Sequence, residues 1–133
     1  MINVSCAIIV KEERILVVQR GPGTSHPFQW EFPGGKVREK ETAEESILRE
    51  IQEELSVEIE VLGQLRTIEH DYGIKQIRLI PFLCRIKSGS LQLTEHIASR
   101  WILPGETHIP DWSEADRKLI GENNDFFSNR KTD

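Results

Sequence analysis

The chain has 133 residues, of which 38% are hydrophobic and 29% charged, as is typical of one globular domain with its own core. A formal net charge of −5 argues against an extended nucleic-acid partner, but not against a small polyanion bound through a cation. No apolar run is long enough to span a membrane, and the first residues lack the basic region of a signal peptide. We expect a cytoplasmic protein with no membrane partner: one domain over residues 1–122, then a polar, flexible tail over 123–133.

The first third of the sequence predicts strands separated by turns. Residues 2–10 and 14–20 are β-rich runs on either side of a charged turn, so they predict a hairpin or neighbouring strands. Gly and Pro residues punctuate 21–29, which predicts a loop. Residues 30–32 predict a short strand that leads into a Pro-Gly-Gly turn.

A helix is predicted over residues 43–55. Thr42 and Glu45 have the spacing of a capping box, in which the Thr hydroxyl and the Glu carboxylate each satisfy a free backbone N–H. Periodicity predicts that four apolar side chains of this helix face a core: Ile47, Leu48, Ile51 and Leu55.

The second half of the sequence predicts further strands and a last helix. Residues 57–71 and 74–86 are long β-prone stretches joined by a turn, and 97–103 predicts another strand. A second helix is predicted over 113–121, with Ser113 as its N-cap.

The first predicted helix carries acidic residues in an unfavourable arrangement. Glu50, Glu53 and Glu54 are spaced i, i+3, i+4, which places their side chains on one face. Only Arg49 offsets their charge at close range, by pairing with Glu53 at i+4, and acids near a helix C-terminus oppose the macrodipole. A solvated acidic face is the simplest interpretation, but a hard divalent cation such as Mg²⁺ would remove both conflicts.

Around these acids the sequence resembles the Nudix hydrolase family. Gly35, five residues, Glu41, seven residues, and then Arg49-Glu50-Ile51-Gln52-Glu53-Glu54 match the spacing and every charged position of the Nudix box. The preceding Trp30-Glu31-Phe32-Pro33-Gly34 is similar to the MutT-like and CTP pyrophosphohydrolase-like subgroup. One position departs, because Ser56 stands where the family has a Gly that ends the helix in a left-handed conformation.

The resemblance implies a fold and a metal site. The implied fold is an α/β/α sandwich with a central mixed sheet, in which the box forms a loop, a helix and a loop. The implied cofactor is Mg²⁺, with Mn²⁺ as the alternative. By position, the implied metal ligands are Glu50, Glu53, Glu54 and a carbonyl of Gly34 or Gly35, while the implied catalytic residues are Arg49, Glu50, Glu53 and Glu95. Glu95 would be a further ligand or the base; an exposed loop Glu is the other interpretation.

The resemblance also implies a reaction and a substrate end. MutT-like enzymes hydrolyse a nucleoside triphosphate to the monophosphate and pyrophosphate, which removes damaged nucleotides from the pool. Asp116 stands where MutT itself has an Asn that reads the base and CTP-type enzymes have an Asp; an ordinary acid in a first helical turn is the alternative. The other candidate substrate-binding residues are His26, Phe32 and Lys36.

Other functions stay open at this point. A Tyr such as Tyr72 is typical of Nudix enzymes that act on dinucleoside polyphosphates, and nucleotide-sugar hydrolysis is a second alternative. A catalytically silent nucleotide sensor is a third, but such modules usually have a degraded box, and every acidic position is present here. The sequence leaves the base, the sugar and the choice between monomer and homodimer open.

Overall fold

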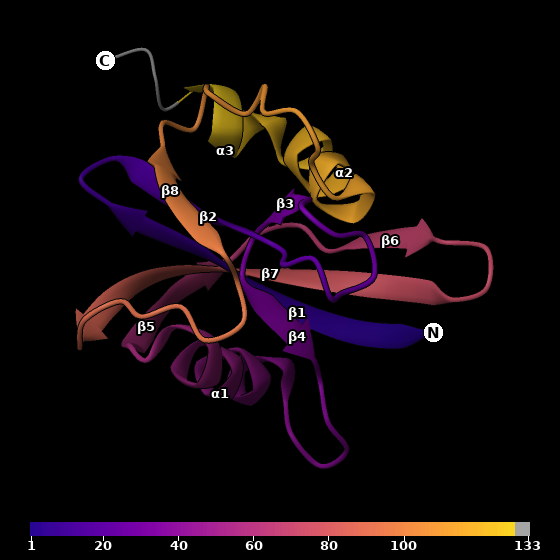
Figure 1. Cartoon of the computed structure of the whole chain (residues 1–133), viewed down its shortest axis with the longest axis horizontal. Coiled ribbons are helices and arrows are strands. Elements are labelled where there is room, and N and C mark those ends of the chain that lie inside the picture. Colours follow the sequence, from indigo (N-terminus) through magenta and orange to yellow (C-terminus); the bar gives the residue numbers. More distant parts are fainter. Residues whose placement is uncertain (130–133) are drawn as a thin grey trace.

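The computed structural model describes residues 1–129. Figure 1 shows a twisted sheet with helices on both of its faces. In chain order the elements are β1 (Ile2–Lys11), β2 (Arg14–Gln19), β3 (Trp30–Glu31), β4 (Gly34–Lys36), α1 (Ala43–Leu55), β5 (Glu58–Gln64), β6 (Ile68–Asp71), β7 (Gln76–Ser88), β8 (Ala98–Ile102), α2 (Glu114–Glu122) and α3 (Asn124–Asn129).

The sheet is mixed and centred on β1. Its main order is β3-β2-β1-β7-β5, while β4 also pairs with β1, β6 with β7 and β8 with β2. The pairing of β1 with β7 is parallel, and the other strand pairs are antiparallel. With α1 on one face and α2 and α3 on the other, the α/β/α sandwich with a mixed sheet is confirmed (Figure 1).

Alternating side chains of the central strands explain why both faces need a cover. In β1, Ala7 and Ile9 belong to the apolar cluster under α1, whereas Cys6 and Ile8 belong to the opposite cluster. All four are at most 2% exposed. Three side chains of α1 belong to the first cluster as expected: Ile47, Ile51 and Leu55. The expectation for Leu48 is wrong, because this residue is 40% exposed and follows Ile47 on the neighbouring face of the helix.

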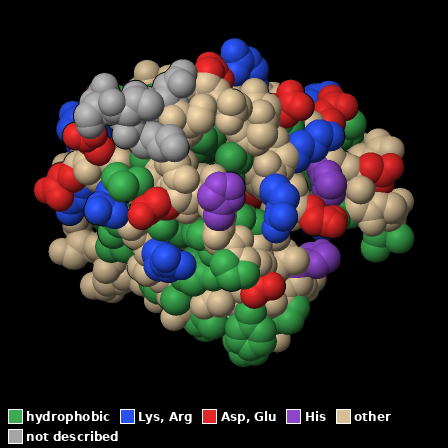
Figure 2. Space-filling model, turned by 90° about the horizontal axis from the view of Figure 1, so that it is seen from above, with side chains coloured by type: hydrophobic (Ala, Val, Ile, Leu, Met, Phe, Trp, Pro, Cys, Tyr) green, Lys and Arg blue, Asp and Glu red, His purple; other side chains and the backbone are tan. Residues whose placement is uncertain are grey.

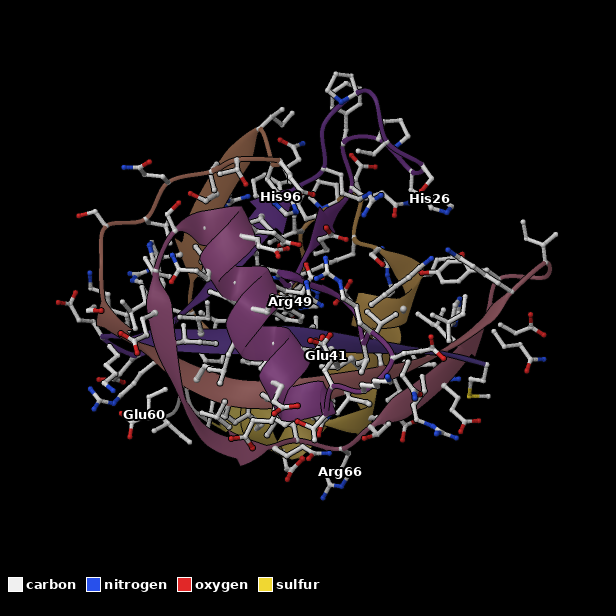
Figure 3. The ribbon with its side chains drawn as sticks, turned by 90° about the horizontal axis from the view of Figure 1, so that it is seen from below. His26, Glu41, Arg49, Glu60, Arg66 and His96 are labelled. Carbon is white, nitrogen blue, oxygen red and sulfur yellow. The ribbon has the colours of Figure 1, made fainter. Side chains whose placement is uncertain are left out.

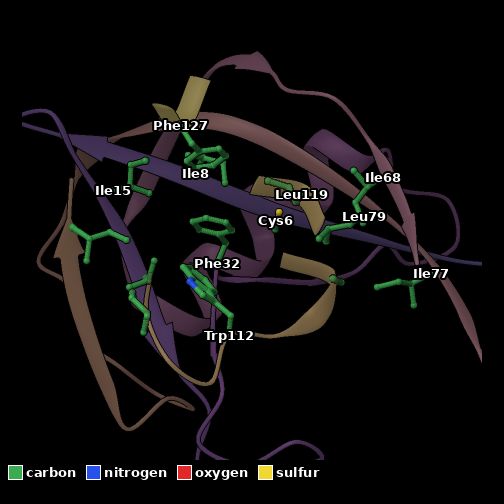
Figure 4. Close-up of a cluster of buried hydrophobic side chains, with 14 residues drawn as sticks. Cys6, Ile8, Ile15, Phe32, Ile68, Ile77, Leu79, Trp112, Leu119 and Phe127 are labelled. Carbon is green, nitrogen blue, oxygen red and sulfur yellow. The ribbon is translucent and has the colours of Figure 1, made fainter. Parts of the chain in front are cut away.

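The opposite cluster is closed by the end of the described chain (Figure 4). Phe127 of α3 is 2% exposed and stacks on Phe32 with ring centroids 5.9 Å apart. Asn123 is 1% exposed and hydrogen-bonds the backbone of Arg66 in both directions. The expected flexible tail is therefore wrong for residues 123–129, because the Asn and Phe side chains in this polar segment are buried; 130–133 lie outside the described residues.

The surface carries charges of both signs. Figure 2 shows acidic and basic side chains interspersed over one face of the molecule. Within residues 1–129, each helix is too short or too polar to cross a bilayer.

Candidate active site

Both ends of α1 are fixed by hydrogen bonds that the sequence encodes. At the N-terminus, the Glu45 N–H donates to Thr42 Oγ1 at 3.0 Å and the Thr42 N–H donates to Glu45 Oε1 at 2.8 Å, which confirms the capping box. At the C-terminus, Ser56 adopts the left-handed conformation, with φ 60° and ψ 30°. The family's helix exit is thus kept although a Cβ stands in place of glycine.

The two glycines of the Pro-Gly-Gly turn make close contacts, with the backbone at Gly34 and with a side chain at Gly35. A Cβ on Gly34 would lie 2.0 Å from the carbonyl oxygen of Ser5, which is backbone and cannot move aside. A Cβ on Gly35 would lie 2.4 Å from the carboxyl carbon of Glu50. The missing side chain of Gly35 therefore leaves the space that the Glu50 carboxylate occupies.

Arg49 holds three carboxylates of the box (Figure 3). Its guanidinium contacts Glu41 at 2.7 and 3.1 Å, Glu50 at 3.0 Å and Glu53 at 3.2 Å, and it donates to the Lys36 carbonyl at 3.2 Å. The hydrogen bonds from Arg49 lower the pKa of Glu41 to about 2, and those carboxylates raise the pKa of Arg49. The expected pairing of Arg49 with Glu53 is confirmed.

Glu54 has the opposite environment. Its side chain is 4% exposed, and its Oε1 is buried with no hydrogen-bond partner. Burial raises its pKa to about 9, and the hydrogen bond with Glu50 and the charges of Glu50, Glu95 and Glu31 act in the same direction. A buried acid among acids is stabilised only by a proton or by a cation. The hard oxygen donors and the orphaned Oε1 therefore fit a divalent cation such as Mg²⁺.

The three acids predicted to share one face do not converge here. Glu53 is directed to Arg49 and to Arg38, the latter at 4.0 Å, and 47% of its side chain is exposed. Within residues 1–129, no three His, Cys, Asp or Glu side chains are already arranged to hold a metal. A metal bound by Glu53 together with Glu54 would require the Glu53 carboxylate to leave these two arginines.

The segment that carries Glu95 is tied to the C-terminus of α1. Thr94 donates its N–H to the Glu54 carbonyl at 3.1 Å and its hydroxyl to the Glu53 carbonyl at 2.9 Å, and the Gln92 N–H donates to the Leu55 carbonyl. These bonds satisfy carbonyls that a helix end leaves free. Glu95 itself is exposed, yet close enough to Glu54 for its charge to act on that carboxyl.

A cavity of about 220 Å³ lies beside the glycine turn. Among the residues that line it are all four predicted substrate-binding residues: His26, Phe32, Lys36 and Asp116. It is bordered by Gly34 and Gly35, so it opens next to the carboxylates. Several other polar residues of the lining were not among the predicted site residues, including Arg20, Glu31 and Lys75.

Asp116 lies at the buried end of this cavity. It is 5% exposed, and burial together with the charge of Glu31 raises its pKa to about 8. Hydrogen bonds from the Ser113 hydroxyl and the Phe32 N–H act in the other direction. Ser113 is the N-cap residue of α2 as predicted, but its side chain makes no capping hydrogen bond.

Glu31 connects the two ends of the site. Its carboxylate accepts a hydrogen bond from Arg20 at 3.2 Å and lies 3.0 Å from Nε2 of His96. Its charge raises the pKa of both Asp116 and Glu54. Figure 3 places His96 toward the far end of α1 from Glu41. Glu31 adjoins the Pro-Gly-Gly turn in sequence, and that was the available signal for it.

Comparison with known proteins agrees with this geometry. The model of the NUDIX domain family matches residues 1–122. The chain is similar to a CTP pyrophosphohydrolase of Escherichia coli, 34% identical over 90% of this chain and 89% of the relative. It is likewise 34% identical to an 8-oxo-dGTP diphosphatase of Proteus vulgaris, over 71% and 83% of the two chains. The solution structure of the E. coli ORF135 protein superimposes with a TM-score of 0.82 at 30% identity, over 100% of this chain and 95% of that one.

Proposed function

The chain belongs to the Nudix hydrolase family, and on that premise we propose that it hydrolyses a nucleoside triphosphate to the monophosphate and pyrophosphate, with Mg²⁺ or Mn²⁺. The observation that carries this proposal is Glu54, a buried carboxyl with a free oxygen among three other acids. Its hydrogen-bond partner Glu50 lies against Gly35, and Gly35 and Asp116 both line the cavity, so one site offers places for a cation and for a polar ring.

The proposed metal site combines residues of α1 and of the glycine turn. Its ligands would be the carboxylates of Glu50, Glu53 and Glu54 and a carbonyl of Gly34 or Gly35. When bound, the metal would screen the phosphate charge and activate a water molecule. Arg49 holds the Glu50 carboxylate against Gly35. Glu50, Glu53 or Glu95 would accept the proton of the attacking water.

The proposed substrate end of the site reads the base. Asp116 offers one carboxyl edge to an exocyclic amino or carbonyl group, and which of the two it prefers depends on its protonation. Lys36 is exposed at the cavity border, and its ammonium group suits the phosphates. The names of the two relatives support CTP or an oxidised purine triphosphate such as 8-oxo-dGTP as the substrate. A role in cleaning the nucleotide pool, a cytoplasmic location and a monomer or homodimer belong to the same proposal.

Product analysis over a panel of triphosphates tests the proposal. Unmodified, methylated and oxidised nucleoside triphosphates are compared by kcat/KM, with Mg²⁺, with Mn²⁺ and with a chelator, while pyrophosphate and orthophosphate are measured separately. We expect pyrophosphate release that requires the metal and favours one base. Release of orthophosphate, or turnover only of dinucleoside polyphosphates or nucleotide sugars, would replace this function by another of the family, and metal-bound protein without turnover would indicate a sensor.

A further inference from the structure

Two aromatic side chains from distant parts of the chain meet at the cavity. His26, in the loop between β2 and β3, and Tyr72, in the turn between β6 and β7, both line it. Their ring centroids are 5.7 Å apart, with an interplanar angle of 35°. The cavity therefore has an aromatic ring on each of two facing segments.

Tyr72 is held firmly. The edge of the His70 ring contacts it with centroids 4.5 Å apart and an interplanar angle of 76°. Its hydroxyl accepts a hydrogen bond from the N–H of Ala115 at 3.3 Å. Since Ala115 directly precedes Asp116, the Tyr72 ring is fixed next to the carboxyl that we propose reads the base.

His26 is held less firmly. It is exposed, and its backbone has φ 56°, a left-handed conformation that is costly for residues other than glycine. Phe28, two residues on, also has a positive φ of 68°. Arg20 and Gln19 hydrogen-bond the flanking residues Ser25 and Phe28. The exposed His26 ring, by contrast, contacts only the Tyr72 ring within residues 1–129, so rotation of its side chain can move it outward.

The alternative aromatic surface, Phe32, is already used by the core (Figure 4). Its ring is 3% exposed and lies against Trp112, with centroids 5.4 Å apart, and against Phe127, at 5.9 Å. It contributes to the cavity wall, but neighbouring rings occupy the surroundings that a stacked base would need. The aromatic surface that is free for a base comes from His26 and Tyr72.

We propose that the nucleobase stacks between His26 and Tyr72, with its edge at Asp116. This inference rests on the proposed function and names two specificity-determining residues for it. A ring inserted at van der Waals contact on both sides needs about 7 Å between the two aromatic planes, so His26 must move outward by roughly 1–2 Å. Stacking grows with ring area, so the pair favours a purine over a pyrimidine and is indifferent to a substrate without a base.

Fluorescence tests the stacking directly. The probe is the deoxyribonucleoside triphosphate of 2-aminopurine, a base whose fluorescence is quenched when it stacks on an aromatic ring. Binding is measured with Ca²⁺ as the divalent cation. We expect binding to wild-type protein to quench the probe, and His26→Asn, which tolerates a left-handed backbone, to reduce the quenching and to weaken binding about ten- to a hundredfold. His26→Phe should restore both. His108→Asn is the matched control, since His108 is exposed and does not line the cavity.

Kinetics provide the second readout. His26→Asn should raise KM for purine triphosphates about ten- to a hundredfold and leave kcat within about twofold, with no effect on a triphosphate of 1,2-dideoxyribose, which has no base. Tyr72→Phe keeps the ring and loses only the hydrogen bond from Ala115, so this variant should still quench the probe. Tyr72→Leu has no aromatic ring and should not quench it. Unchanged quenching in both His26→Asn and Tyr72→Leu overturns the inference even if wild-type protein turns over triphosphates. Quenching that depends on both rings, in a protein without turnover, supports the inference and overturns the proposed function.

Discussion

Arg49 and Glu54 lie on the same helix, but the acidic side chains around them have opposite environments. Around Arg49, three carboxylates share one guanidinium, and the pKa of Glu41 falls to about 2. At Glu54, burial and three neighbouring acids raise the pKa to about 9, and one oxygen has no partner. Burial raises the pKa of Glu54 and hydrogen bonds from Arg49 lower that of Glu41, so the surroundings of these two acids set their pKa values.

This difference separates the acids that stabilise the fold from the acid that we propose binds the metal. The acids around Arg49 are satisfied within the protein, so they fix the loop before α1 to the helix. One oxygen of Glu54 has no partner, so binding of a cation there would stabilise the folded protein. Asp116 is a second buried acid, with a pKa raised to about 8, but it accepts hydrogen bonds from Ser113 and Phe32.

The largest effect is expected when Glu54 loses its charge. Glu54→Gln keeps the shape but cannot become an anion, so kcat should fall roughly a hundred- to a thousandfold while the Tm of the metal-free protein stays the same or rises. Steady-state kinetics and calorimetry measure the two quantities. Glu44→Gln, an exposed acid on the same helix, is the control. A near-normal kcat in Glu54→Gln would remove Glu54 from the proposed site.

Asp116 tests whether the second raised pKa sets base choice. Below about pH 8 its protonated carboxyl both donates and accepts, and above that pH the carboxylate only accepts, which favours the amino edge of cytosine over the carbonyl edge of 8-oxoguanine. Asp116→Asn always does both. At pH 9 the kcat/KM ratio of the two substrates should differ between wild type and variant by roughly ten- to a hundredfold. An equal change for every substrate would instead make Asp116 structural.

The pH dependence of stability gives a smaller effect with a definite sign. Because the pKa of Glu54 is raised from 4.5 to about 9, the folded protein holds a proton that the unfolded chain releases, so stability falls as the pH rises between these values. Asp116 acts with the same sign up to about pH 8, while Glu41 loses its stabilising charge only as the pH falls toward 2.

We therefore expect the Tm of the metal-free protein to decrease from pH 6 to pH 9. Mg²⁺ must replace the proton on Glu54, so the rise in Tm that it causes should grow over the same range. Differential scanning calorimetry with and without Mg²⁺ measures both trends. A Tm that is flat with pH, and a Mg²⁺ effect that is equally flat, would contradict the raised pKa of Glu54.

The smallest effect is expected at Ser56, which ends α1 after Glu53 and Glu54. Ser56 has φ 60°, so Ser56→Gly should raise the free energy of unfolding by about 0.5–1 kcal/mol, because glycine adopts this conformation without a steric cost. Urea denaturation at pH 7 measures the change, with Ser90→Gly in a loop as the comparison. A loss of stability in Ser56→Gly would mean that the gain in unfolded-chain entropy outweighs the relieved strain.

Local patterns in the sequence predicted what depends on neighbours along the chain. The capping box at Thr42 needs only residues three apart, and the strand over residues 2–10 needs only a β-rich run. The mixed sheet and the sandwich came from the resemblance carried by the box. Leu48 was misplaced because the apolar stripe of α1 is narrower than the periodicity suggested.

Contacts between distant segments were beyond such patterns. His96 lies 65 residues from Glu31, and His26 meets Tyr72 only because two loops face one cavity. The i+4 spacing predicted the pairing of Arg49 with Glu53, but no spacing reveals that Glu54 is buried with an oxygen that has no partner, since that depends on side-chain torsions and on the packing of distant segments. The burial of Phe127 had one indication in the sequence, because aromatic residues stand here in an otherwise polar segment.

The burial of Phe127 against Phe32 has a consequence for how a nascent chain can fold. β1 and β2 are synthesised first, yet the cover of one of their two faces is completed only when residue 127 has been added. Up to that point, the cluster that contains Ile8 and Ile15 lacks its last member. During synthesis the cluster under α1 can therefore be completed earlier than the cluster on the opposite face, because none of its members lies beyond Trp101.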